Sequence, residues 1–300
     1  MMDWHREALE LSKQGLNSGE ITRQLKSIGF FQGEDFSPCY ERVRKYVRKH
    51  SGGKNHVTQN VIPNTFDHTY EEKVIKFGLI SDTHLGSNYD EPELLHEFYN
   101  ECKKQGIKSV YHCGDITDGY AMRVGHEYEI YAHGADAIID NVVEKYPAVC
   151  GIKTYFITGN HDASIYKHCG VDIGKHIDER RSDLHYLGRD CARINLDNAV
   201  TLELRHPWDG SAYAISQKSQ KIIDNMWENR PTIIGIGHYH KAEFIYYKGV
   251  YAFQCGCFQH QTPFEVGKNI LPVVGGWIIE ITLNKNGDIK SISPKFINFN

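Results

Sequence analysis

The stretch Gly159-Asn160-His161-Asp162 decides how this chain is interpreted. It directly follows residues 152–158, a run of mostly β-branched and aromatic residues that predicts a buried strand. Gly159 turns the chain and leaves Asn160 and His161 at the carboxyl end of that strand, the edge at which open α/β sheets bind ligands. Asn160 offers an amide oxygen to a metal ion. His161 offers a ring that can hydrogen-bond or donate a proton.

Polar clusters of the same kind follow four other apolar runs of the sequence. These clusters are Asp82-Thr83-His84, Gly114-Asp115, His206 and Gly237-His238-Tyr239-His240, after residues 74–80, 109–113, 200–204 and 232–236. A single Asp or His at a strand end is usually a cap or a turn residue. Five clusters that supply carboxylate, imidazole and amide groups at equivalent positions predict one shared site.

Taken in order, the five clusters resemble the pattern of the calcineurin-like metallophosphoesterases, which is DxH, GD, GNH[DE], H and GHxH. The match covers residues 74–283 and leaves the stretch before it unexplained. The resemblance implies an α/β fold, a four-layer αββα sandwich of two mixed sheets with helices on both outer faces. It also implies two divalent metal ions, either Mn²⁺ or a mixed pair with Fe or Zn, because no thiolate is among the ligands.

The resemblance assigns the metal ligands position by position. It implies a first ion held by Asp82, His84, Asp115 and His240, and a second held by Asp115, Asn160, His206 and His238. Two such ions clamp a phosphate ester and lower the pKa of an attacking water. His161 is not a ligand in the pattern, and we expect it to stabilise the developing charge or protonate the leaving group. We expect Asp162 either to orient His161 or to hold the turn.

The motifs also bear on the class of substrate. Residues 114–120 lack the Arg of GDxxDRG, and Asp162 stands where the protein phosphatases of the family usually have Glu. The stretch Ser81–Gly86 resembles the first motif of the Mre11/SbcD-type nuclease branch. We therefore expect a phosphodiesterase acting on nucleic acid. One alternative is a small-molecule or cyclic-nucleotide phosphodiesterase or phosphatase. The other is a DNA-binding regulatory protein with a vestigial metal domain.

The loop 116–132 is rich in aromatic and cationic residues and follows Asp115. We expect it to form a substrate-binding lip, in which Arg123 contacts phosphate while Tyr120 and His126 contact the rest of the substrate. The alternative is an ordinary folded surface loop.

The first fifty residues predict three short helices. Asp3, Asn17 and Ser37 are suitable N-caps, and apolar residues recur after each at spacings of three and four. This pattern resembles a helix-turn-helix module whose third helix is basic. We expect four of its residues to contact DNA phosphates, namely Arg44, Lys45, Arg48 and Lys49. The alternatives are a merely solvated polar face and a protein-interaction bundle.

The charge of the chain is divided unevenly. Residues 1–54 carry ten Lys and Arg against seven Asp and Glu, whereas the rest is acidic enough to bring the whole chain to a net charge of −4. A basic segment at one end suggests contact with a polyanion such as DNA.

Composition and local patterns suggest a soluble protein of two domains. A hydrophobic share of 40% with 24% charged residues is ordinary for such proteins. No apolar run approaches the ~18 residues of a membrane helix, and no secretory stretch opens the chain, so we expect a cytoplasmic protein with reduced cysteines. We predict a helix-turn-helix-like domain over residues 1–50, a linker over 51–73 and a metallophosphoesterase domain over 74–300.

Overall fold

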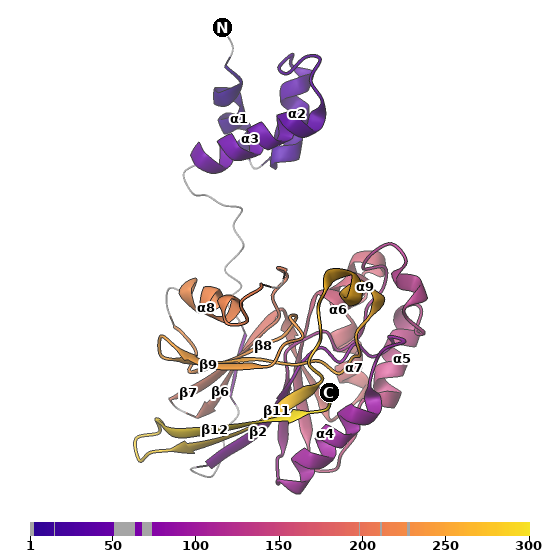
Figure 1. The fold of residues 1–300 in the computed structure, drawn as a ribbon, viewed down its shortest axis with the longest axis vertical. Coiled ribbons are helices and arrows are strands. Elements are labelled where there is room, and N and C mark those ends of the chain that lie inside the picture. Colours follow the sequence, from indigo (N-terminus) through magenta and orange to yellow (C-terminus); the bar gives the residue numbers. More distant parts are fainter. Residues whose placement is uncertain are drawn as a thin grey trace. The chain divides into compact units, whose positions relative to one another are not determined.

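The protein is represented by a computed structural model that describes residues 3–14, 16–50, 64–67, 74–197, 199–210, 212–226 and 229–300. The chain divides into two compact units, Met1–Ile62 and Pro63–Asn300 (Figure 1). Each unit has hydrophobic clusters of its own.

The first unit consists of helices α1 (Trp4–Lys13), α2 (Ser18–Ser27) and α3 (Phe36–His50). The Asp3 carboxylate accepts a hydrogen bond from the first turn of α1, and Asn17 forms a capping box with Glu20 on α2. Helix α3 begins one residue before the predicted cap, Ser37. The helices bury a small common core of Ala8, Leu11, Ile21, Leu25 and Val43.

The second unit contains two six-stranded mixed sheets. The first sheet has the order β12-β11-β2-β3-β4-β5, with β2 (Val74–Ile80), β3 (Ser109–His112), β4 (Lys153–Thr158), β5 (Leu184–Arg189), β11 (Gly275–Leu283) and β12 (Ile289–Asn298). The second has the order β1-β6-β7-β8-β10-β9, with β1 (Asn64–Asp67), β6 (Cys191–Asp197), β7 (Val200–Arg205), β8 (Ile233–Ile236), β9 (Glu243–Tyr247) and β10 (Val250–Gln254). Strands β2 to β5 are parallel, as are β7, β8 and β10.

The two sheets pack face to face and are covered by helices on their outer sides (Figure 1). Side chains such as Phe77 and Leu202 fill the space between the sheets. Helices α4 (Pro92–Lys104), α5 (Ala135–Lys145) and α7 (Ile173–Arg180) pack on the first sheet, whereas α8 (Gln217–Asp224) packs on the second. The four-layer αββα sandwich expected from the sequence is thereby confirmed.

Several elements differ from the expectations. Strand β1 lies within residues 51–73, where no periodicity indicated it, and it pairs with β6. Strands β5 and β12 and the short helix α9 (Pro263–Lys268) were not predicted either. Helix α6 (Asn160–Cys169) begins directly after Gly159, so Asn160 and His161 lie in its first turn.

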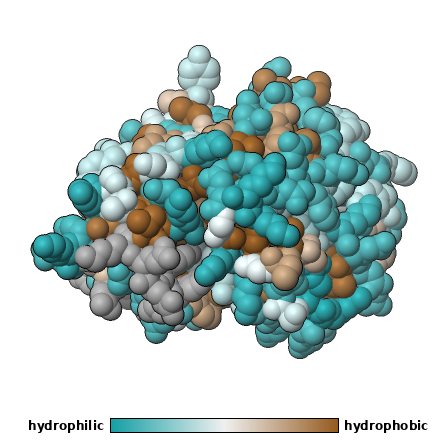
Figure 2. Space-filling view, turned by 90° about the horizontal axis from the view of Figure 1, so that it is seen from below, coloured by the Kyte–Doolittle hydropathy of each residue, from teal (hydrophilic) through white to brown (hydrophobic). Residues whose placement is uncertain are grey.

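On the face drawn in Figure 2, hydrophilic side chains predominate and hydrophobic ones appear in separate patches. None of the helices among the described residues is long and apolar enough to cross a membrane.

Candidate metal centre and active site

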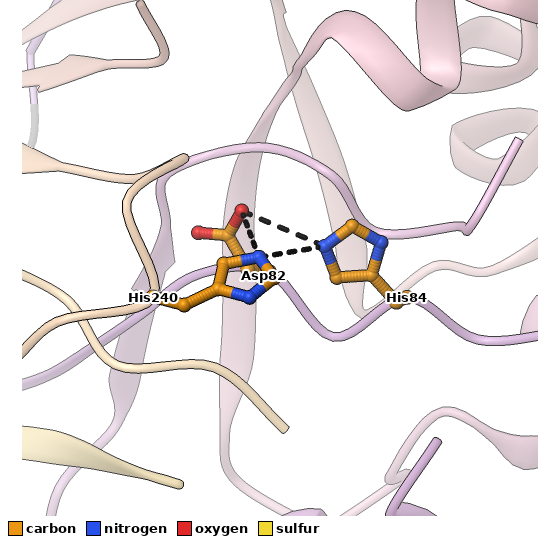
Figure 3. Close-up of side chains that lie close together, drawn as sticks. All are labelled: Asp82, His84 and His240. Atoms are coloured by element: carbon orange, nitrogen blue, oxygen red, sulfur yellow. Dashed lines mark hydrogen bonds and ion pairs between the residues drawn. The ribbon is translucent and has the colours of Figure 1, made fainter. Parts of the chain in front are cut away.

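A first group of donor atoms forms where the end of β2 meets the loop after β8. The Nε2 atoms of His84 and His240 lie 3.1 Å apart. The Oδ1 atom of Asp82 lies 3.4 Å from Nε2 of His240 and 3.7 Å from Nε2 of His84 (Figure 3). Asp82 and His84 are buried and His240 is partly buried, and these three side chains could hold a metal ion.

A second group forms beside it from the ends of β3, β4, β7 and β8. Nε2 of His206 lies 3.0 Å from a carboxylate oxygen of Asp115 and 3.0 Å from the amide oxygen of Asn160. A ring nitrogen of His238 completes the group with Asp115 and His206. The seven residues predicted as ligands are therefore brought together as two adjacent sets of donors. Their role as ligands, and that of Asp115 as a bridge, remain proposals.

The backbone at these strand ends is unusual. Five of the predicted ligands have left-handed φ angles between 45° and 79°, namely Asp82, His84, Asp115, His238 and His240. Such conformations cost roughly 1–3 kcal/mol each and collect at functional sites. The sharp turns that they make direct side chains from separate strands toward the same point.

Each histidine of the two groups is held by a hydrogen bond at its outer ring nitrogen. Nδ1 of His84 lies 2.9 Å from the Asp118 carboxylate, and Nδ1 of His240 lies 2.8 Å from the Glu265 carboxylate. Nδ1 of His206 lies 2.8 Å from the Cys113 carbonyl oxygen, and Nε2 of His238 lies 2.9 Å from the Asp209 carbonyl oxygen. An acceptor at one nitrogen fixes the tautomer and leaves the other nitrogen as a ligand. The residues present therefore fit a pair of divalent ions.

The electrostatics of the buried groups lead to the same conclusion. Burial acts to raise the pKa of Asp82, but hydrogen bonds from His240 and His84 hold it well below its usual range. Burial acts to lower the pKa of His206, yet the charge and hydrogen bond of Asp115 raise it to about 9. The buried Asp82 carboxylate thus remains ionised and requires positive charge around it, which bound metal ions would supply.

His161 is oriented by Asp118. Its Nδ1 lies 2.7 Å from the carbonyl oxygen of Asp118 and 3.1 Å from the carboxylate of the same residue. Asp162 instead accepts hydrogen bonds from the backbone of Gly159, Ile116 and Thr117, so its geometry supports the alternative in which it holds the turn. The spacing Gly114-Asp115-x-x-Asp118 was the signal in the sequence for Asp118.

A cavity of about 470 Å³ opens beside the two donor groups. His84, Asp115 and His161 are among the residues that line it. Its lining also includes Arg123, Phe264 and Lys268, and the Arg123 guanidinium lies 4.5 Å from the centre of the Phe264 ring. The residues from α9 were missed in the sequence because a six-residue helix shows little periodicity.

Two members of the predicted substrate lip lie elsewhere. His126 is completely buried, with Nε2 3.3 Å from Asp118, so it cannot contact a substrate at the surface. Tyr120 is half-buried, packs against the core and His168, and is not among the residues that line the cavity. Arg123 does line the cavity, where it also pairs with Glu129.

The predicted DNA contacts belong to α3. Arg44 and Lys45 are exposed there, and Arg44 pairs with Glu41 at 3.0 Å. The side chains of Arg48 and Lys49 lie outside the described part of the structure.

A four-layer αββα sandwich with a cluster of Asp, Asn and His at its strand ends defines a metallophosphoesterase fold. The calcineurin-like phosphoesterase superfamily domain matches residues 75–266, so the chain belongs to that superfamily. The fold of this superfamily uses a dinuclear metal site and supports hydrolysis of phosphoesters.

Curated relatives include DNA polymerase II small subunits from archaea. The protein from Halobacterium salinarum is 24% identical over 71% of this chain and 49% of its own length. That from Methanothermobacter thermautotrophicus is 24% identical over 68% of this chain and 52% of its own length. The chain thus spans about half the length of the curated relatives it matches.

Similar solved structures include an archaeal phosphodiesterase, with 13% identity and a TM-score of 0.43 over 74% of this chain and 100% of that one. Another is Vps29 from Entamoeba histolytica in complex with zinc, with 16% identity and a TM-score of 0.37 over 75% of this chain and 100% of that one.

Proposed function

We propose that this protein is a metal-dependent phosphodiesterase that hydrolyses nucleic acid, with two divalent ions in the site formed by the seven predicted ligands. The observation that carries the proposal is the pair of adjacent, largely buried donor groups, several of whose residues line a cavity. Two ions held there would supply Lewis-acid chemistry and lower the pKa of the attacking water. Mn²⁺ is the ion we expect to work best.

His161 performs the acid–base work in this proposal. Its Nδ1 is engaged by Asp118, so Nε2 is the nitrogen available to a substrate in the cavity. From there it donates a hydrogen bond to the charged phosphate oxygens or a proton to the leaving oxygen. Its backbone N–H donates to Oδ1 of Asp115 at 2.8 Å, which fixes the ring relative to the metal centre.

The cavity wall suits a nucleotide. Arg123 and Lys268 supply positive charge for a phosphate, and Phe264 supplies an aromatic surface for a base. A volume of about 470 Å³ falls within the range of small-ligand sites. The names of the curated relatives, which concern a DNA polymerase, add support for a nucleic-acid substrate.

A substrate panel in the presence of Mn²⁺ tests the proposal. It comprises bis-p-nitrophenyl phosphate, p-nitrophenyl phosphate, cyclic nucleotides and end-labelled DNA. We expect turnover of the diester and of DNA, with little turnover of the monoester. Turnover of only cyclic nucleotides or monoesters would establish the small-molecule alternative. If the metal-loaded protein turned over none of these substrates, the result would favour the alternative of a DNA-binding regulatory protein with a vestigial metal domain.

A second candidate is suggested by the relatives, which are named as small subunits of a polymerase. In this case the protein works as a subunit of a DNA-synthesising complex. Affinity purification of the chain from its native host, followed by a primer-extension assay of the eluate, tests this role. Eluates without polymerase activity would count against it.

We further propose that residues 1–50 bind DNA through α3. The exposed Arg44 and Lys45 support this role, as does the excess of basic residues in this part of the chain.

A further inference from the structure

Two half-exposed aromatic rings, each covered by a cation, lie beside the metal centre. Trp208 is 48% exposed and Tyr166 is 50% exposed. Nζ of Lys167 lies 4.5 Å from the centre of the Trp208 ring, and the Arg189 guanidinium lies 5.3 Å from that of Tyr166. We call these four residues the aromatic–cation platform. None of them lines the cavity.

The platform is built on the same elements as the second donor group. Helix α6 begins at Asn160 and carries Tyr166 and Lys167 further along. Trp208 follows His206 by two residues, and the next residue, Asp209, accepts the hydrogen bond from His238. The platform therefore lies next to the second donor group, on the same helix and the same loop.

The Trp208 ring is fixed in position. Its indole Nε1 donates to the carboxylate of Asp190 at 2.9 Å, and the backbone N–H of His206 donates to the Asp190 carbonyl at 2.7 Å. Asp190 follows Arg189 at the end of β5, so the two halves of the platform are connected through this residue. A ring held in this way is preorganised for stacking, which lowers the entropic cost of binding.

The charges of the platform favour an anionic ligand. Lys167 and Arg189 are exposed cations over the rings. Of the neighbouring acids, Asp209 pairs with Lys218 at 2.7 Å and accepts from Tyr239 at 2.5 Å, whereas Asp190 accepts from Trp208 and keeps its charge. The two cations of the platform therefore outnumber this one acid. Aromatic faces for bases combined with cations for phosphates are the features by which proteins bind single-stranded nucleic acid.

We propose that the aromatic–cation platform binds an unpaired nucleotide strand, DNA or RNA, alongside the metal centre. This inference rests on the proposed nuclease-like function, because it supplies the path by which a strand reaches the cleavage site. One nucleotide enters the cavity, and its neighbours stack on Trp208 and Tyr166.

Binding of short oligonucleotides to the full chain tests the proposal directly. Fluorescein-labelled dT12 and rU12 are titrated in EDTA, where no hydrolysis takes place, and the anisotropy is recorded. We expect Trp208→Ala and Tyr166→Ala each to weaken binding by about tenfold, the usual loss of one stacked base. Trp208→Phe should keep most of the affinity, because it retains an aromatic face. The dT12 and rU12 arms show whether the strand is DNA, RNA or either.

Tyr246→Ala is the matched control. Tyr246 is 63% exposed on strand β9 and is not part of the platform, so its loss should leave the affinity unchanged. Equal affinity of the Trp208→Ala, Tyr166→Ala and parent chains would overturn the proposal.

Crosslinking distinguishes binding at the platform from binding at the first unit, for which a DNA contact is also proposed. An oligonucleotide carrying 5-iodouracil is irradiated with the full chain, and the modified peptides are identified by mass spectrometry. We expect adducts on Trp208 or Tyr166. Adducts confined to residues 1–50 would contradict the platform.

Turnover of bis-p-nitrophenyl phosphate distinguishes this inference from the proposed function. Trp208→Ala should lower the cleavage of dT12 more strongly than it lowers the turnover of this small diester. A parent chain that hydrolyses neither substrate would contradict the proposed function, whereas the binding and crosslinking results would still decide the platform.

Discussion

At the scale of single residues, Gly159 shows how closely the metal centre is packed. Its φ of −110° is accessible to any residue, so the restriction is one of space alone. A Cβ atom at this position would lie 2.3 Å from Oδ1 of Asp115 and 2.6 Å from the His206 ring. We expect Gly159→Ala to displace these two groups, to lower metal content and activity at least ~10-fold, and to cost about 1–3 kcal/mol of stability.

Gly267 on helix α9 is the control for this substitution, because a Cβ atom there meets nothing within 4 Å. Gly267→Ala should leave metal content unchanged and stabilise the fold by up to ~1 kcal/mol, since alanine favours a helix. Metal analysis and thermal unfolding of both variants give the comparison. Normal metal binding by Gly159→Ala would show that the two donor groups tolerate displacement.

His161 and Asp118 are expected to differ in their effects on metal binding. His161→Ala should retain both ions while turnover of the diester falls by ~10²–10⁴, the usual effect of losing a proton-transfer group. Asp118→Asn should lower turnover and, unlike His161→Ala, should also weaken metal binding by ~10–100-fold, because Asp118 holds Nδ1 of His84. Calorimetric titration with Mn²⁺ and steady-state kinetics measure the two effects. Loss of metal from His161→Ala would place that residue among the ligands.

Asp115 provides the test of a dinuclear centre. Asp115→Asn should lose most metal and activity together if its carboxylate serves both ions, because an amide is a weaker ligand for either. Metal analysis after Mn²⁺ loading should find two ions per parental chain. A parental stoichiometry of one ion would exclude the bridge.

At the scale of elements, helix α3 is the part of the first unit proposed to bind DNA. We expect replacement of Arg44, Lys45, Arg48 and Lys49 by Ala to weaken binding to duplex DNA and to flatten its salt dependence. The reason is counterion release, which contributes a log–log slope of about −0.9 per contacted phosphate. Fluorescence anisotropy over a salt series measures it. Unchanged binding at every salt concentration would indicate a protein-interaction bundle.

The elements that could be predicted from the sequence are those whose burial leaves a pattern. Strands β2, β3 and β4 are parallel and buried, so they appear as continuous apolar runs that end at polar site residues. Strand β12 is an edge strand of mixed polarity that includes Pro294, and β1 is only four residues long, so neither produces a comparable signal.

The same reasoning explains the outcome at the site. The seven predicted ligands could be found because their order and strand-end positions form a pattern in the sequence. Of the groups that hold them, Asp118 left a signal in the spacing Gly114-Asp115-x-x-Asp118, although its contact with His84 across the fold did not. Glu265 left none, because it reaches His240 from a six-residue helix. His126 was assigned to the surface because a loop residue that is completely buried has no distinguishing pattern.

At the scale of the whole molecule, the two units should unfold separately. The hydrophobic cluster among the described residues of the first unit has five buried side chains, whereas the second unit contains three larger or additional buried clusters between and outside its two sheets. We expect calorimetry to show two transitions, with the first unit melting at the lower temperature, because small cores are marginally stable.

Metal ions should then shift only one of the two transitions. Mn²⁺ at a hundred times its dissociation constant stabilises the folded second unit by about 2.7 kcal/mol, since it binds the native state and leaves residues 1–50 untouched. For a unit of this size, that corresponds to a rise of roughly 5–10 °C in its melting temperature. The Asp115→Asn variant is the control and should show little rise. A single transition, or an equal rise in both, would show that the two units do not unfold independently.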